Sequence, residues 1–252
     1  MANSRLDALR TSVQRLQAIA GDLPDDALTG RAYPSEWTIA DVLSHLGSGA
    51  VITTRRLTDI LAGQDTPEEL SPAVWAEWDA KSPQAKRTDG LAADAALLDA
   101  LDALTPEERD RFAFSMGPID VDFDGFVGLR LNEHALHTWD IDVALDAAAT
   151  IPADIAALVV DNLSLIARFT AKPTGDTTAV TVATHDWLHG LTVELTPHAA
   201  VAATGTPTGT PDVTVENESM VRLVYGRLDR DHTPSGDASA VLDTLRRVFP
   251  GP

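Results

Sequence analysis

Hydrophobic residues in the first half of the chain recur every three or four positions, the spacing that gives a helix one apolar face. Near the start, Leu6, Leu9 and Leu16 follow this spacing until Gly21 interrupts it. The same pattern predicts four main helices, over residues 5–19, 38–62, 91–104 and 124–146. We expect residues 66–87 to form helix and loop.

The second of these helices carries a start signal. Thr38 and Asp41 stand three residues apart at the start of an apolar stripe, which is typical of a capping box. Four long helices in succession favour an all-α, antiparallel four-helix bundle, a fold that places metals and cofactors between facing helices. We expect this domain to cover residues 1–149.

After Pro152 the pattern changes to the alternation of Val and Thr that is typical of strands. It predicts strands over residues 179–183, 190–195 and 212–216, with helices over residues 153–170, 219–228 and 238–249. These elements indicate a small α+β domain over residues 150–252. The Gly and Pro residues of TGTPTGTP, Thr204–Pro211, interrupt regular structure, and the segment lacks the ending of a phosphate-binding loop, so we interpret it as a connecting loop.

Charge and composition argue against several classes of function. The formal net charge of −19 over 252 residues argues against nucleic-acid binding, which draws its affinity from clustered Lys and Arg. No apolar run approaches the roughly 20 residues that span a bilayer, and the opening MANSRLDALR lacks a signal-like apolar segment. We therefore expect a cytoplasmic protein without membrane attachment. The chain has no cysteine, so thiol chemistry would need an external thiol.

Residues 132–140, NEHALHTWD, concentrate ionisable groups in the last of the four predicted helices. Residues four apart lie about 40° apart around a helix, so Arg130, Glu133, His137 and Asp140 fall on one narrow stripe beside the apolar face. Burying a carboxylate and an imidazole is costly unless they are paired or bind a cation. Glu133 and His137 could hold one divalent ion from successive turns, or form a salt bridge on a solvated face.

His45 is the candidate for a third ligand, because it lies in the apolar run of a different predicted helix. Taken alone, a histidine there is more often a core or boundary residue satisfied by a hydrogen bond. Together with Glu133 and His137, it completes a set of two imidazoles and one carboxylate. Asp140 could orient His137 as a hydrogen-bond acceptor, or it could lie exposed.

Other histidines carry weaker signals. We expect His134, which lies on a different face of the helix from Glu133, to be solvated. His185 and His189 bracket Trp187 between two predicted strands, where turn and surface roles are more common than catalysis.

The segments WTIADVLSHL, residues 37–46, and NEHALHTWD, residues 132–140, resemble those of the mycothiol-dependent maleylpyruvate isomerases in residue type and order. The N-terminal half of that family is a DinB-like four-helix bundle. In the second half, DVTV (212–215), VYGRL (224–228) and LRRVFPG (245–251) are similar to the family's second domain, as a looser match. The resemblance covers nearly the whole chain.

The resemblance implies a ligand set and a reaction. His45, Glu133 and His137 would hold zinc, and three protein ligands leave a position open, as in catalytic zinc sites. Mycothiol bound there would lose its proton, because the cation stabilises the thiolate. The thiolate would add to the cis double bond of maleylpyruvate, the resulting single bond would rotate, and elimination would give fumarylpyruvate. Arg227 would bind the substrate carboxylate with its planar guanidinium, unless it pairs with an acid such as Asp229.

The ligand set leaves several functions open. A relative with the same metal and thiol could transfer the thiol onto electrophiles instead of isomerising an unsaturated acid. The bundle could also hold a metal without catalysis, as a binding module, or the stripe could be a salt-bridge network without a metal. Two histidines and a carboxylate suit iron, nickel and manganese as well as zinc. The expected partners are a small-molecule thiol and a small electrophilic or unsaturated acid.

Overall fold

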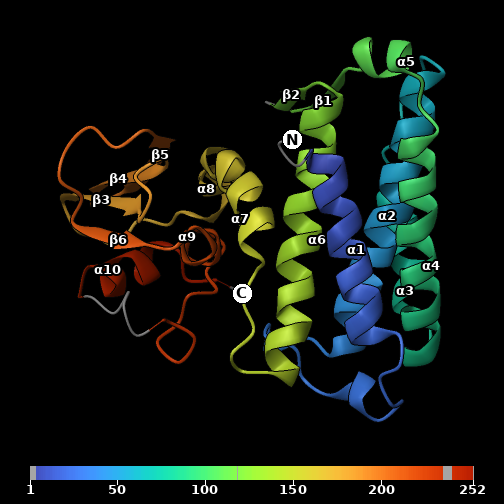
Figure 1. Ribbon diagram of the computed structural model, residues 1–252, viewed down its shortest axis with the longest axis horizontal. Coiled ribbons are helices and arrows are strands. Elements are labelled where there is room, and N and C mark those ends of the chain that lie inside the picture. The colour runs from blue at the N-terminus through green and yellow to red at the C-terminus, as the bar shows by residue number, and fades with distance from the viewer. Residues whose placement is uncertain (1–3, 118, 235–239, 252) are drawn as a thin grey trace. The chain divides into compact units, whose positions relative to one another are not determined.

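The computed structural model describes residues 4–117, 119–234 and 240–251, and the chain divides into two compact units, Met1–Ala149 and Thr150–Pro252. The first unit consists mainly of helices and includes a short two-stranded hairpin, whereas a four-stranded sheet lies in the second unit (Figure 1). This distribution confirms the predicted change from a helical N-terminal part to a C-terminal part that contains a sheet. None of the helices formed by the described residues combines the length and the apolar character that crossing a bilayer requires.

The first unit contains the four long helices that the hydrophobic pattern predicts. They are α1 (Arg5–Ala20), α2 (Ile39–Leu61), α4 (Pro83–Asp102) and α6 (Phe123–Leu145). The shorter elements are η1 (Ala27–Thr29), α3 (Leu70–Asp79), α5 (Pro106–Asp110), β1 (Phe114–Met116) and β2 (Ile119–Val121). Helix α4 begins well before the predicted start at Leu91, because the Ser82 hydroxyl accepts a hydrogen bond from the Ala85 N–H and Pro83 occupies the first turn.

The capping box predicted at the start of α2 is present. The Thr38 hydroxyl accepts a hydrogen bond from the Asp41 N–H at 3.2 Å, and an Asp41 carboxylate oxygen accepts one from the Thr38 N–H at 3.0 Å. These two bonds fix where α2 begins. They therefore also fix the direction in which His45, in the second turn, leaves the helix.

Among the long helices of the first unit, α1 packs against both α4 and α6, and α2 also packs against both (Figure 1). The backbones of α2 and α4 approach closely where Gly47 meets Gly90. A Cβ atom on Gly47 would lie 2.7 Å from the Cα atom of Gly90 and 2.3 Å from the ring of Trp78 on α3. This contact therefore requires glycine, since any side chain would push the two helices apart.

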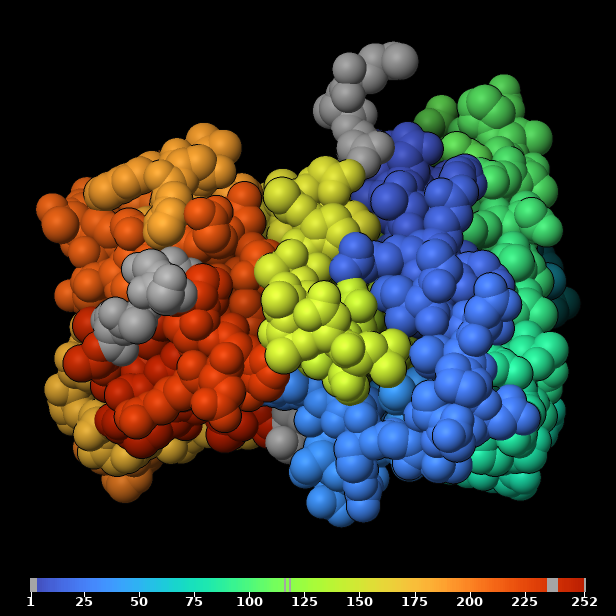
Figure 2. All heavy atoms as spheres, turned by 60° about the horizontal axis from the view of Figure 1, so that its bottom comes forward, coloured from blue at the N-terminus to red at the C-terminus, as the bar shows by residue number. Residues whose placement is uncertain are grey.

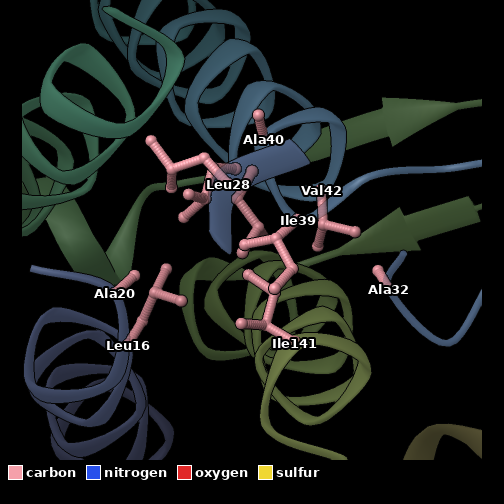
Figure 3. Close-up of a cluster of buried hydrophobic side chains, with 10 residues drawn as sticks. Leu16, Ala20, Leu28, Ala32, Ile39, Ala40, Val42 and Ile141 are labelled. Carbon is pink, nitrogen blue, oxygen red and sulfur yellow. The ribbon is translucent and has the colours of Figure 1, made fainter. Parts of the chain in front are cut away.

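A cluster of buried apolar side chains joins α1, η1, α2 and α6 (Figure 3). Its members are Leu16, Ala20, Leu28, Ala32, Ile39, Ala40, Val42, Leu43, Leu46 and Ile141. Atoms of α1 and of the segment that leads into α2 form part of the surface of this unit (blue in Figure 2). Each buried Leu or Ile contributes about 1.5–3 kcal/mol, so the cluster holds α2 and α6 together.

A polar network lies buried among the same helices. The Asp94 carboxylate on α4 accepts a hydrogen bond from Arg130 Nη2 at 2.6 Å, and its other oxygen lies 3.3 Å from His134 Nε2. On the other side of the ring, His134 Nδ1 lies 2.8 Å from the Ser12 hydroxyl on α1. His134 is fully buried, so the expectation that it is solvated is wrong. Two of its partners, Ser12 and Asp94, come from α1 and α4, which the sequence of α6 alone does not reveal.

The second unit combines helices with a sheet of strand order β5-β4-β3-β6. The strands are β3 (Thr178–Thr184), β4 (Gly190–Thr196), β5 (Ala199–Gly205) and β6 (Val213–Val215). The helices are α7 (Ala153–Val159), η2 (Val160–Asn162), α8 (Leu163–Thr170), α9 (Asn217–Val224) and α10 (Ala240–Val248). Strand β3 pairs antiparallel with β4 and parallel with β6, and β4 pairs antiparallel with β5.

Two predicted elements of the second half differ in the structure. The helix predicted over residues 153–170 is divided by η2, where Asp161 and Asn162 have low helix propensity. Strand β5 was not predicted, because its sequence is rich in Ala, which is uncommon in strands. Its pairing with β4 and its packing against α8 outweigh that preference. Because β5 extends to Gly205, the connecting loop is shorter than the predicted Thr204–Pro211.

The last two helices also differ in their bounds. Helix α9 ends at Val224 rather than at the predicted Leu228, and Gly226 beyond it adopts a φ of +70°, which interrupts the helix and favours glycine. The predicted start of the final helix, at Ala238, lies outside the described residues.

Replacement of Asp94 by Asn should change the dependence of stability on acid pH. Burial raises the pKa of Asp94, but the charges and hydrogen bonds of His134 and Arg130 outweigh this effect, and the pKa falls below 3.8. A carboxyl group with a lowered folded-state pKa stabilises the fold above its unfolded pKa, and that contribution is lost as the pH falls through the folded-state value. We expect wild type to exceed Asp94→Asn in free energy of unfolding by about 3–5 kcal/mol at neutral pH, as for a broken buried ion pair.

Urea unfolding at a series of pH values measures this difference. It should begin to shrink once the pH falls below 3.8, because the carboxyl group then binds a proton in the unfolded chain while it stays ionised in the folded one, and it should be lost as the pH falls through the lower folded-state pKa. Asp102→Asn, which changes an exposed carboxylate on the same helix, is the control and should alter stability by less than about 1 kcal/mol. A wild-type advantage that stayed constant down to the lowest pH at which both proteins fold would contradict the prediction.

Candidate metal centre

Two helices of the first unit supply the three residues that the sequence proposes as metal ligands. His45 lies on α2, and Glu133 and His137 lie on successive turns of α6. His45 Nε2 is 3.3 Å from Glu133 Oε2, and His137 Nε2 is 3.7 Å from the same oxygen. One ligand atom from each of the three residues lies within 4.8 Å of the other two. The structure therefore brings His45 together with a pair of residues that lies far from it in the sequence.

These distances fit the coordination sphere of a small divalent ion. Ligand atoms about 2.0–2.2 Å from a tetrahedral zinc ion lie about 3.3–3.6 Å from one another. The two separations from Glu133 Oε2 are close to this range. The rings of His45 and His137 meet edge to face, with centroids 4.4 Å apart, and the Nε2 atom of each ring faces the same oxygen of Glu133. As a donor set, two imidazoles and one carboxylate suit zinc and other transition metals.

Asp140 forms a buried hydrogen bond with His137. Its carboxylate is fully buried and lies 2.8 Å from His137 Nδ1. Of the two roles considered for Asp140, exposure is therefore wrong, and the hydrogen bond with His137 is present. An acceptor at Nδ1 places the ring proton there and leaves the lone pair on Nε2, the nitrogen that faces Glu133.

The electrostatic surroundings hold Glu133 and His137 in the protonation states that metal binding requires. Desolvation raises the pKa of Glu133, but the hydrogen bond with His45 and electrostatic interactions with neighbouring groups, Arg130 among them, outweigh it, and the pKa falls to about 2. Burial lowers the pKa of His137, although the hydrogen bond with Asp140 opposes the shift. At neutral pH the site therefore presents a carboxylate and a neutral imidazole, the forms that coordinate metals.

The candidate site is accessible rather than enclosed. The side chains of Glu133 and His45 are 44% and 35% exposed, whereas that of His137 is 10% exposed. A structural metal site is closed by four protein ligands, but a catalytic site keeps a position open to a small molecule. Three donors with two accessible side chains match the second type.

The aromatic ring of Trp37 lies beside the rings of His45 and His137. Its ring stacks near that of His137, with centroids 6.0 Å apart and an interplanar angle of 22°, and its centroid lies 5.4 Å from that of His45. Trp37 therefore restricts the rotation of both imidazoles. We did not predict this role, although the sequence contains a signal for it. An apolar residue directly before a helix cap, here Thr38, commonly packs back onto the helix.

Arg227 lies in the second unit, beyond the end of α9. It is 7% exposed, and its Nη1 atom donates a hydrogen bond to the carbonyl oxygen of Tyr225 at 2.9 Å. Asp229, the acid considered as its partner, lies 2.8 Å from the Nδ1 atom of His232. The role of Arg227 in binding a substrate stays a prediction.

The structure places His185 and His189 in the turn between β3 and β4, as predicted. His185 lies 3.1 Å from a carboxylate oxygen of Glu216, and His189 lies 3.6 Å from one of Asp161. These contacts give neither histidine a place in the metal centre.

Known proteins share both the sequence pattern and the fold of this chain. A family model described as the mycothiol maleylpyruvate isomerase N-terminal domain matches residues 9–142. A crystal structure of the mycothiol-dependent maleylpyruvate isomerase is similar with a TM-score of 0.62 and 17% identity, over 88% of this chain and 88% of that chain. The crystal structure of a histidine-to-alanine mutant of this isomerase gives the same TM-score and coverage at 16% identity.

At such low identity the two structures show a common fold, and no curated protein matches the sequence. The family model, by contrast, spans more than half of the chain and includes His45, Glu133 and His137. The chain therefore belongs to the mycothiol maleylpyruvate isomerase family.

Proposed function

We propose that this protein is a metal- and mycothiol-dependent enzyme that isomerises a maleylpyruvate-like unsaturated acid from the cis to the trans form. The observation that carries the proposal is the convergence of His45, Glu133 and His137 within 4.8 Å, with His137 held by a buried carboxylate. Membership of the family, whose model includes these three residues, supports the choice of thiol and substrate.

The residues of the site match the demands of a divalent ion, for which we propose zinc. Glu133 supplies a charged oxygen, and the imidazoles supply two nitrogen donors without adding charge. When bound, such an ion supplies a Lewis acid that stabilises the thiolate form of a thiol at neutral pH. The thiol must come from outside the chain, because the sequence has no cysteine. The exposed sides of Glu133 and His45 leave it a path of approach.

The same proposal assigns roles to the two units. We propose that α1, α2, α4 and α6 form the DinB-like four-helix bundle and that residues 1–149 are the metal-binding domain. The pairwise packing of these helices supports this assignment. Residues 150–252 would then be the family's α+β second domain. A location in the cytoplasm stays a prediction.

Arg227 is our candidate for binding the carboxylate of the substrate. A guanidinium group pairs with a carboxylate through two parallel hydrogen bonds, which fixes the orientation of an acid as well as its position. The bond to the Tyr225 carbonyl holds one edge of the Arg227 guanidinium in a defined direction. Preorganisation of this kind lowers the entropy lost on binding.

Removal of any one ligand should abolish tight metal binding. We expect His45→Ala, Glu133→Gln and His137→Ala each to weaken zinc affinity by more than about 100-fold, since even the loss of an outer-shell partner costs 10–100-fold. Titration with a chromogenic chelator measures the affinity, and elemental analysis measures the metal content after purification. His185→Ala removes an exposed histidine that contacts Glu216 and is the matched control. A ligand variant that kept the wild-type affinity would remove that residue from the metal centre.

Zinc-loaded protein should convert maleylpyruvate to fumarylpyruvate only when mycothiol is present. Chromatography of the reaction mixture with and without the thiol measures this conversion. Unchanged maleylpyruvate together with conjugation of the thiol to an epoxide or a haloarene would instead identify an S-transferase. Tight zinc binding without either reaction would identify a non-catalytic binding module, and the absence of bound metal would leave a salt-bridge network. Iron, nickel and manganese are tested in the same assay.

Loss of the Arg227 guanidinium should lower the catalytic efficiency for the acid substrate but leave the affinity for the metal unchanged. A hydrogen bond to a charged group contributes about 1.5–3 kcal/mol, so we expect Arg227→Met to lower kcat/KM for the acid roughly 10- to 100-fold. Zinc affinity should stay at the wild-type value. Arg230→Met, which removes an arginine whose side chain is 77% exposed and pairs with Asp243, is the control. Wild-type kcat/KM in a folded Arg227→Met variant would rule out the role.

A further inference from the structure

A second cluster of ionisable groups lies beside the metal centre without supplying any of its proposed ligands. Asp94 on α4 is 1% exposed and forms an ion pair with Arg130 of α6, whose side chain is 5% exposed. Arg130 and His134 lie on either side of Glu133 in α6, and Arg130 also contacts the backbone next to His45. The cluster therefore borders two of the proposed ligands.

One carboxylate holds the turn of α6 that carries Glu133. Arg130 lies three residues before Glu133, and His134 lies directly after it. Arg130 Nη2 donates to Asp94 Oδ1 at 2.6 Å, and His134 Nε2 lies 3.3 Å from Asp94 Oδ2. Asp94 thus contacts α6 on both sides of Glu133, so a shift or rotation of this turn of α6 would break at least one of the two contacts.

The same guanidinium reaches the turn of α2 that carries His45. Arg130 Nη2 also donates a hydrogen bond to the backbone carbonyl of Leu46 at 2.8 Å, the residue after His45. Gly49, one turn further on, leaves room for this contact, since a Cβ atom there would lie 2.8 Å from Arg130 Nη1. The ion pair therefore connects the segments of α2 and α6 from which two ligands project.

A catalytic role for the cluster is incompatible with its burial. Ser12, His134 and Asp94 are linked in the order of a serine–histidine–aspartate triad, with Ser12 Oγ 2.8 Å from His134 Nδ1. The three residues are 1%, 0% and 1% exposed, so no substrate reaches the hydroxyl. Stability alone does not explain the ion pair either, because well-packed apolar residues often stabilise a core as well as a buried ion pair does.

We propose that Asp94 is a positioning residue of the metal centre, which through Arg130 and His134 fixes Glu133 and His45 at the separation that metal binding requires. The inference rests on the proposed metal-binding function. It assigns a role to a residue of α4, a helix that contributes none of the three ligands.

The test is the affinity of Asp94→Asn for zinc and its absorption spectrum with cobalt(II). Asn keeps the shape of the side chain but removes the charge that holds Arg130. We expect zinc to bind about 10- to 100-fold more weakly, as for other residues that orient a metal ligand. We also expect an altered cobalt d–d spectrum, which reports the geometry of the ligands. Asp102→Asn, on the exposed side of the same helix, should leave both measurements unchanged.

A double variant separates positioning from stability. Asp94→Leu combined with Arg130→Met replaces the ion pair by apolar side chains and leaves His134 its contacts with Ser12 and Thr138. We expect this protein to regain wild-type thermal stability while its zinc affinity stays about 10-fold or more below wild type. If Asp94→Asn does not fold, the zinc affinity of this double variant tests the positioning role instead. Recovery of both stability and affinity would show that the pair is merely structural and would overturn the proposal.

The outcomes for the wild-type protein keep this inference distinct from the proposed function. Wild-type protein that bound no zinc or cobalt would reject the metal centre and the positioning role together. Wild-type binding with equal affinity in a folded Asp94→Asn variant would reject the positioning role alone.

Discussion

The first unit is organised around one electrostatic constraint, which is that three lone-pair donors must stay close together on two separate helices. Without a cation between them, nitrogen and oxygen lone pairs do not attract one another. The hydrogen bond between His45 and Glu133 at 3.3 Å and the charge of Arg130, which both lower the pKa of Glu133, offset this repulsion. The buried carboxylate of Asp140 orients His137 from the other side. The apolar cluster beside the site then holds α2 and α6 at the distance that these contacts need.

Local patterns in the sequence predict part of this arrangement, and the physical reason is that helices are periodic. The spacing of Glu133 and His137 places both on one stripe of α6, and Thr38 with Asp41 marks where α2 begins. The meeting of His45 with Glu133 is a contact between distant segments. No local pattern predicts it, and it was inferred from the combination of ligand types and from the family resemblance.

The same limit explains the residues that were predicted wrongly. We expect His134 to be solvated because it lies on a different face of the helix from Glu133, and this expectation takes no account of the helices packed against that face. Two partners of His134, Asp94 and Ser12, lie on α4 and α1 and become visible only when the helices are packed together. Strand β5 is a similar case, since its Ala-rich sequence disfavours a strand and its pairing with β4 decides the outcome.

The charges of the three proposed ligands bear on the kind of molecule that the site would accept. Glu133 contributes one negative charge, and His137 is neutral because burial lowers its pKa. With both imidazoles neutral, a divalent ion held by this set would retain one net positive charge. A single thiolate neutralises that charge, whereas a neutral thiol or water leaves it in place. This balance is the same for an isomerase and an S-transferase, because both begin from the thiolate. The residues that separate the two activities must therefore contact the second substrate rather than the metal.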